Sequence, residues 1–196
     1  GAGMVVDPEV FREEVATLQG QGLLAGDELR VSLDAHLILP YHRDLDGARE
    51  DFSAAKGKAI GTTRRGIGPC YEAKAARRGI RVRDLFEREL LRERLERNVA
   101  LANPELERLG SDARVDVDTI MKSAEDWAAW LKPMICDAGA TVTDALARGE
   151  KVLFEGAQGA MLDVDSGTYP YVTSSVTTAG GVCTGLGVGP TVINEV

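Results

Sequence analysis

Residues 61–81, GTTRRGIGPCYEAKAARRGIR, combine a glycine-rich loop with a dense set of basic side chains. Glycines at 61, 66 and 68 allow positive φ angles and a close approach of the backbone to a ligand. Successive N–H groups in such turns can form an anion-binding nest, and guanidinium groups fit phosphate oxygens. The polar side chains of the loop are Thr62, Thr63, Arg64 and Arg65. The stretch therefore predicts a site for a phosphorylated small molecule.

A short helix is expected to follow the loop, because Pro69 suits the first turn of a helix and Gly79 suits its end. Four basic residues on it are spaced i, i+3, i+4 and i+7, which predicts one shared basic face. They are Lys74, Arg77, Arg78 and Arg81. From the residues alone, two interpretations stay open: the face binds an external anion, or it pairs with acids elsewhere in the chain or in a partner subunit.

Basic charge is concentrated in one part of the chain. Residues 56–83 contain nine Lys or Arg residues and a single acid, a net charge of +8, whereas the whole chain carries −8. A focused positive patch on an acidic chain favours a small anion over a nucleic acid. No apolar run reaches the ~20 residues of a membrane span. Because a secretory signal is also absent from residues 1–19, we expect a cytoplasmic protein that binds neither membranes nor nucleic acid.

Strand and helix patterns alternate along the first part of the chain. Residues 4–6 look like the end of a buried strand, and Asp7 and Pro8 then mark the start of a helix. A strand is predicted at 29–33 and a helix at 41–52. This order indicates an α/β architecture with strands flanked by helices.

A helical subregion is predicted at about 83–148. It comprises a charged helix over 83–99, with an apolar stripe, and a long helical stretch over 115–148 that breaks near Pro133. The stripe consists of Leu85, Phe86, Leu90, Leu91 and Leu95. Trp127 and Trp130 are expected to pack on a helix face. Because no repeat or low-complexity linker is present, we expect residues 1–196 to form one domain.

A second polar cluster follows an apolar strand predicted at 151–154. Ligands of open α/β sheets bind beyond the carboxyl ends of strands, so Gln158 is well placed to contact a base edge or a ribose hydroxyl. The hydroxyl-rich residues 173–178 can line a phosphate pocket or cap a helix. Asp163 and Asp165 could bind a metal, but their position before a glycine favours turn and capping roles.

The three cysteines and the two histidines predict no metal or disulfide site. The cysteines are widely spaced and odd in number, and the histidines lack ligand spacing. They are Cys70, Cys136, Cys183, His36 and His42. We expect no catalytic role for either histidine.

Residues 66–77, GIGPCYEAKAAR, resemble the signature G-I-G-P-x-Y-x-x-K-x-x-R of the adenylosuccinate synthetase family. FEGAQG at 154–159 and GTYPYVTSS with TTAGG at 167–181 resemble two further blocks of that family, in the same order. VVDPEVF and LILPYHRDLDGARE also fit, so the resemblance covers nearly the whole chain. It implies a P-loop-NTPase-like, mostly parallel sheet flanked by helices, with a helical insert.

The resemblance implies a ligase that uses GTP to join IMP to L-aspartate in purine nucleotide biosynthesis. GTP would phosphorylate O6 of IMP, and the aspartate amine would then displace that phosphate. Thr63 resembles a ligand of the IMP phosphate, and Arg77 the arginine that reaches IMP in the other subunit of a homodimer. Gln158 and Thr173 resemble further IMP contacts. Lys74 is the signature lysine, either catalytic or shaping the local potential.

The chain also departs from the family pattern. The family's GDEGKGK loop holds GTP phosphates and supplies a catalytic aspartate, and residues 1–6 do not match it. The ligands of the implied Mg²⁺ would lie with that loop, so we expect no metal site in this chain. We therefore expect an internal fragment that is inactive alone. Ser166, Val176 and Arg64 stand where many relatives have histidine, asparagine and glycine.

Two alternatives remain. A phage-type member of the family joins aspartate to a deoxyguanylate, and the aspartate of the missing first loop would distinguish it. The long insert between the basic loop and FEGAQG favours the ordinary bacterial enzyme. A non-catalytic anion-binding or scaffold protein could use the basic face for a partner, and titration with IMP would separate it from the enzyme.

Overall fold

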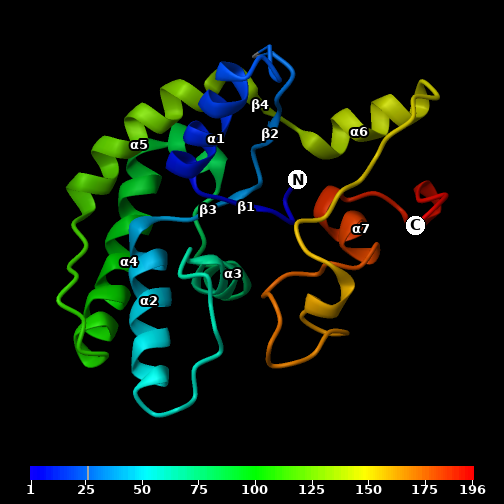
Figure 1. Ribbon diagram of the computed structural model, residues 1–196. Coiled ribbons are helices and arrows are strands. Elements are labelled where there is room, and N and C mark those ends of the chain that lie inside the picture. Colours follow the sequence, from blue (N-terminus) through cyan, green and yellow to red (C-terminus); the bar gives the residue numbers. More distant parts are fainter. Residues whose placement is uncertain (26) are drawn as a thin grey trace.

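The computed structural model describes residues 1–25 and 27–196. Short parallel strands lie among helices, which confirms the predicted α/β architecture (Figure 1). The parallel pairs are β1 (Val5–Val6) with β3 (His36–Leu37), and β2 (Val31–Ser32) with β4 (Ile135–Cys136). Strand β2 lies inside the strand predicted at 29–33. None of the helices formed by the described residues is long and apolar enough to cross a membrane.

Helix α1 (Pro8–Gly20) begins where the sequence predicts. Oδ1 of Asp7 accepts hydrogen bonds from the N–H groups of Glu9 and Val10 at 3.1 and 3.3 Å. Pro8 occupies the first turn, where its missing N–H costs nothing. Strand β1 before it is half-buried rather than buried as expected. Local capping chemistry fixes the helix start, whereas burial depends on what packs against the strand.

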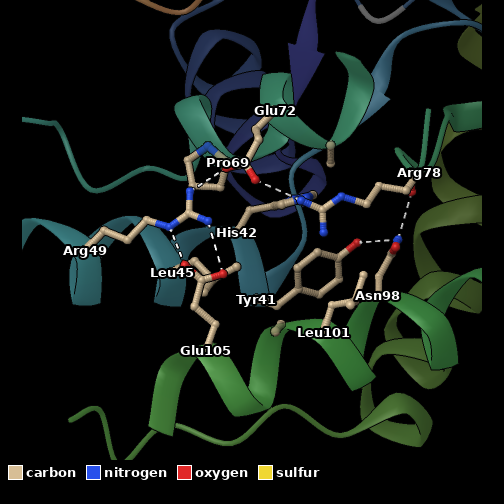
Figure 2. Close-up of a pocket in the computed structure, with 12 residues that line it drawn as sticks. Tyr41, His42, Leu45, Arg49, Pro69, Glu72, Arg78, Asn98, Leu101 and Glu105 are labelled. Carbon is tan, nitrogen blue, oxygen red and sulfur yellow. Dashed lines mark hydrogen bonds and ion pairs between the residues drawn. The ribbon is translucent and has the colours of Figure 1, made fainter. Parts of the chain in front are cut away.

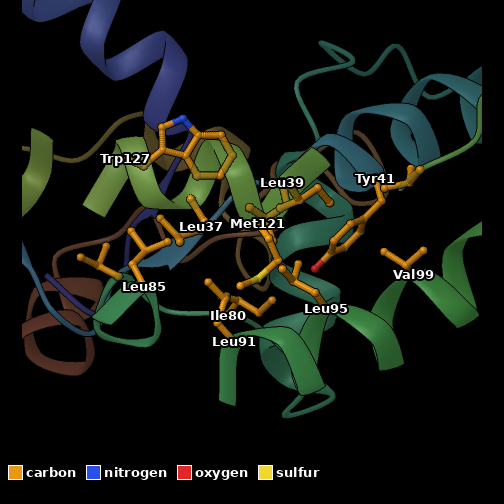
Figure 3. Packing of buried hydrophobic residues seen from close by; sticks show 14 of the residues in the cluster. Leu37, Leu39, Tyr41, Ile80, Leu85, Leu91, Leu95, Val99, Met121 and Trp127 are labelled. Carbon is orange, nitrogen blue, oxygen red and sulfur yellow. The ribbon is translucent and has the colours of Figure 1, made fainter. Parts of the chain in front are cut away.

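The hydrophobic core lies among α2 (Pro40–Ala54), α4 (Arg88–Arg108) and α5 (Val117–Leu131) (Figure 3). Helix α2 contains the predicted helix at 41–52. Trp127 is 3% exposed, which confirms its packing role, and Leu37 is fully buried. Within the described part of the chain, no residue after Ile135 belongs to this core.

The apolar stripe predicted for the charged helix is only partly correct. Its buried members are Leu85, Leu91 and Leu95. Phe86 and Leu90 are each 38% exposed, so the prediction is wrong for these two. A 3₁₀ turn, η1 (Val82–Phe86), precedes α4, and its three-residue period does not continue the α-helical stripe.

The break predicted near Pro133 is confirmed. Helix α5 ends at Leu131, and Pro133 lies in the 3₁₀ turn η2 (Lys132–Met134). Strand β4 then follows inside the stretch that was predicted as helix. Helix α6 (Ala138–Ala147) resumes after Asp137, whose carboxylate accepts from the N–H of Ala140 at 3.0 Å. A two-residue strand is too short for its period to be recognised in the sequence.

The strand predicted at 151–154 is wrong. Residues 149–158 contain no helix or strand, and Leu153 is 90% exposed. A strand needs a hydrogen-bonding neighbour, and none of the described residues makes a backbone hydrogen bond with residues 151–154. The remaining elements are η3 (Ala160–Leu162), α7 (Gly180–Leu186) and η4 (Pro190–Val192). In Figure 1, α6 and α7 lie on the opposite side of β1 from α4 and α5.

Candidate functional site

A groove of about 1260 Å³ lies between α3 (Ile67–Ala75) and the C-terminal stretch 149–196. Lys74, Gln158 and Thr173 all line it, so the structure brings together three of the five predicted site residues. The other two, Thr63 and Arg77, do not line the groove, and both are exposed. The predicted site residues therefore form one cluster and two separate surface positions.

Helix α3 begins two residues before the predicted Pro69 start. Its N-cap is Gly66, at φ +77°, a left-handed conformation that favours glycine. The Gly66 N–H donates to Oδ2 of Asp46 at 2.9 Å. A Cβ at this position would lie 2.8 Å from the backbone nitrogen of Arg43, so no other residue fits without a backbone shift.

The predicted anion nest is contradicted for two N–H groups of residues 61–81, and the N–H group of the preceding Ile60 is occupied as well, because carboxylates of α2 accept hydrogen bonds from all three. The Gly61 N–H donates to Oε1 of Glu50 at 2.7 Å, and the Ile60 N–H donates to Oε2 at 3.4 Å. The Gly66 N–H is taken by Asp46. The acids of α2 hold the loop against that helix, so these three groups are not available to an external anion.

The shared basic face predicted for the helix is wrong, because α3 ends before three of its four members. Ala76 caps the helix, and Arg77 turns the chain at φ +59°. The N–H groups of Arg78 and Gly79 both donate to the carbonyl of Ala73 at 3.0 Å. This pattern is typical of a helix that ends in a left-handed residue. The usual residue there is glycine, which is why the sequence pointed to Gly79.

Two of the basic residues after α3 pair with acids of the same chain. Arg78 contacts Glu72 at 2.9 Å, and Arg81 contacts Asp34 at 3.0 Å. By contrast, the side chain of Arg77 has no hydrogen bond or ion pair within residues 1–25 and 27–196. Internal pairing therefore explains Arg78 and Arg81 but leaves Arg77 for another partner.

Lys74 and Tyr71 attach α3 to the N-terminal segment. Nζ of Lys74 donates to the carbonyl of Ala2 at 2.7 Å, and the Tyr71 hydroxyl donates to the carbonyl of Gly3 at 2.8 Å. Burial lowers the pKa of Lys74, and the nearby charge of Arg81 lowers it further. A half-buried cation with a lowered pKa on a groove wall is typical of a functional position.

Asp163 organises the second polar cluster. It is 1% exposed, and Oδ1 accepts from the N–H groups of Asp165 and Ser166, both at 3.0 Å. Oδ2 accepts from Thr177 at 2.6 Å and from Thr178 at 3.3 Å. These bonds, with those from Ser166 and Thr177 most effective, lower the pKa of Asp163 to about 2. The turn-and-cap interpretation of Asp163 is confirmed.

The bonds to Asp163 close a loop that carries Thr173. The Thr173 N–H donates to the carbonyl of Leu162 at 2.9 Å, and the Val164 N–H donates to that of Ser175 at 3.2 Å. The sequence did not single out Asp163 over Asp165, because an Asp-x-Asp pattern does not reveal which carboxylate is buried. In the described parts of the chain, no group of three His, Cys, Asp or Glu side chains could hold a metal ion.

The departure at Arg64 has a structural explanation. Arg64 has φ +56°, so its backbone occupies the left-handed region that glycine adopts without strain. Its guanidinium pairs with Asp51 of α2. Ser166 donates its N–H to Asp163, a bond that any residue except proline could make there. Val176 is 46% exposed.

Comparison with known proteins identifies one family. The family model for adenylosuccinate synthetase matches residues 1–196. The adenylosuccinate synthetases of Pelobacter propionicus and Streptococcus gordonii are each 48% identical over 197 residues, covering 100% of this chain and 45% of the relative. A solved structure of fully ligated adenylosuccinate synthetase from Plasmodium falciparum superposes with a TM-score of 0.86 at 37% identity. That match covers 99% of this chain and 44% of the other. The chain thus spans less than half the length of these relatives.

Proposed function

This chain belongs to the adenylosuccinate synthetase family, and from that premise we propose that it is the IMP-binding segment of a GTP-dependent ligase. The parent enzyme would join IMP and L-aspartate into adenylosuccinate in AMP synthesis. The observation that carries the proposal is the groove, where Lys74, Gln158 and Thr173 come together from distant parts of the sequence. At about 1260 Å³ the groove is larger than the usual ~300–1,000 Å³ of a small-molecule pocket, so it has room for a nucleotide.

Each groove residue offers chemistry that suits IMP. The amide of Gln158 donates and accepts, as the edge of a purine or a ribose hydroxyl requires. Thr173 lies on a loop held by Asp163, and its hydroxyl accepts a hydrogen bond from the Ser175 hydroxyl at 3.4 Å. Lys74 adds positive potential while it is bonded to the carbonyl of Ala2. Thr63 does not line the groove, and its assignment to the IMP phosphate of its own subunit rests on the family resemblance.

The placement of Arg77 is consistent with a homodimer. Its exposed side chain lies outside the groove and lacks a partner in the described chain, which suits a residue that acts in the site of another subunit. A guanidinium is well matched to a phosphate or to the acceptors of a nucleotide. We therefore propose that the parent enzyme is a homodimer and that it works in the cytoplasm.

In the reaction, GTP phosphorylates O6 of IMP once N1 has lost its proton, and the aspartate amine then displaces the phosphate. The residues of this chain would hold and orient IMP and balance its negative charge. They do not fit the Mg²⁺ that the family implies. The oxygens of Asp163 already accept four N–H groups, and the described residues offer no cluster of three metal ligands. We place that ion and the GTP loop outside this chain.

Steady-state kinetics of the full-length synthetase test the proposal. Thr173→Val and Gln158→Ala should raise KM for IMP about tenfold or more, the usual effect of losing one ligand hydrogen bond, with KM for GTP unchanged. Thr141→Val is the matched control, because among the described residues its hydroxyl donates only to the carbonyl of Asp137, the N-cap of α6. Equal effects on IMP and GTP, or none on either, would count against an IMP site in this groove.

A further inference from the structure

Arg78, the residue after Arg77, is held at each of its polar groups. Its N–H donates to the carbonyl of Ala73 at 3.0 Å, and its guanidinium donates to Glu72 at 2.9 Å. Its carbonyl accepts from Nδ2 of Asn98 at 2.9 Å (Figure 2) and, over a longer distance of 3.4 Å, from the exposed guanidinium of Arg97. These bonds come from α3 and α4, so the turn after α3 is fixed from two sides.

Arg77 itself combines a strained backbone with an unattached side chain. At φ +59° it occupies a conformation that costs free energy for any residue with a Cβ. Its side chain is exposed and bonds to nothing else in the described chain. Strain of this kind persists only where the surroundings impose it, and it is concentrated at functional sites. Here the hydrogen bonds that hold Arg78 impose the strained conformation on Arg77.

Asn98 is not the residue that stability alone would favour. It is 3% exposed on α4, and Nδ2 also donates to the hydroxyl of Tyr41 at 3.2 Å. Its Oδ1 is buried and has no hydrogen-bond partner among the described residues. Leaving such an oxygen unpaired costs free energy, so an asparagine here reduces stability. The hydrogen bonds from Nδ2 therefore point to a role for Asn98 beyond stability.

We propose that Asn98 is a positioning residue for Arg77. By holding the carbonyl of Arg78, it keeps Arg77 in its left-handed conformation. It thereby sets the direction in which the Arg77 side chain projects from the surface of the subunit. The inference rests on the proposed function, in which Arg77 reaches IMP in the partner's site.

Two neighbouring contacts support the same turn. Glu72, which holds the Arg78 guanidinium, also pairs with Arg49 of α2, and Arg49 pairs in turn with Glu105 of α4 at 2.9 Å (Figure 2). A Cβ at Gly79 would lie 2.4 Å from the ring of His36, so the backbone after Arg78 packs directly on β3. The ion pairs are partly exposed and weak individually, which leaves Asn98 as the buried contact.

The test compares Asn98→Leu with Asn103→Leu in the full-length synthetase. Asn103 lies on the same helix, but its amide bonds Val115 before α5, at 2.9 and 3.0 Å. Asn98→Leu should raise KM for IMP about tenfold and leave KM for GTP and kcat within about twofold, as expected when one binding group is misplaced. Asn103→Leu should leave all three constants unchanged, although it loses two hydrogen bonds.

Arg77→Leu, alone and combined with Asn98→Leu, separates the positioning role of Asn98 from the proposed role of Arg77 in IMP binding. If Arg77→Leu raises KM for IMP and Asn98→Leu does not, the positioning role is overturned and the proposed function stands. If Arg77→Leu itself leaves KM for IMP unchanged, the role of Arg77 fails and the positioning role with it. The double variant should match Arg77→Leu alone, because a positioning residue has no effect once its target is gone. If Asn98→Leu does not fold, Asn98→Ser is measured against the same expectations.

Discussion

The backbone N–H of Gly66 donates a hydrogen bond to Oδ2 of Asp46 across 2.9 Å. This bond joins α2 to the start of α3 inside the protein, because Asp46 is only 6% exposed. At φ +77°, a Cβ on Gly66 would lie 2.8 Å from the nitrogen of Arg43 and 2.9 Å from the carbonyl carbon of His42. A carboxylate on one helix and a missing Cβ therefore set where the next helix begins.

Gly66→Ala should destabilise the protein by about 2–4 kcal/mol, because the added Cβ overlaps backbone atoms at a strained φ. Gly61→Ala is the matched control. Gly61 has a similar φ of +85°, but in the part of the chain that the structure describes no atom beyond its chain neighbours lies within 4 Å of an added Cβ, so only the conformational cost of about 1 kcal/mol remains. Urea unfolding of both variants measures the difference. Equal losses would mean that the contact with α2 does not constrain α3.

Asp163→Asn should disturb the groove while Asp165→Asn should not. An asparagine at 163 would direct an NH₂ group at N–H donors that now share a carboxylate, whereas Asp165 is exposed. Asp163→Asn should lower the midpoint of thermal unfolding and raise KM for IMP about tenfold, since hydrogen bonds to a charged group are strong. If the two variants behave alike, the loop that carries Thr173 does not depend on Asp163.

Acid should destabilise the protein through His42. Burial, aided by the charges of Arg78, His36 and Arg49, lowers the pKa of His42 to about 3 from an ordinary 6.5. The unfolded chain therefore binds the extra proton in this window, and stability falls as pH drops from about 6.5 toward 3. The slope from one such group is about 1.4 kcal/mol per pH unit.

His42→Asn tests that slope. Nδ1 of His42 accepts the Leu39 N–H at 3.0 Å, and the asparagine oxygen can occupy the same place without titrating. Free energies of unfolding measured between pH 4 and pH 6 should then depend less on pH, by about 1.4 kcal/mol per unit. An unchanged slope would show that His42 takes up its proton without unfolding.

The features that follow local rules could be predicted from the sequence. Asp7 and Pro8 specify the start of α1 by capping alone, and Pro133 interrupts the helical stretch by lacking an N–H. The family resemblance selected Lys74, Gln158 and Thr173, which share one groove. Their contacts with IMP remain predictions.

The errors involve contacts between distant segments. The end of α3 at Ala75 was missed because an arginine, rather than a glycine, takes the left-handed position there, and Asn98 helps to hold that turn. Residues 151–154 match a strand pattern, but a strand also needs a neighbouring strand to pair with, and the local sequence does not show whether one is present. The N–H groups that were expected to bind an anion instead donate hydrogen bonds to the carboxylates of Glu50 and Asp46 in α2.

The central claim is that Thr63 serves the IMP site of its own subunit and Arg77 that of its partner. Co-expression of Thr63→Ala with Arg77→Leu tests it in full-length dimers. A hybrid dimer would hold one site with neither substitution and one site with both.

The measurement is the rate of adenylosuccinate formation at an IMP concentration where each variant alone is nearly inactive. The account predicts that the mixture recovers about a quarter of wild-type activity, because about half of the dimers are hybrids with one intact site each. A mixture no more active than the separate variants would contradict it, since Thr63 and Arg77 would then serve the same subunit's site.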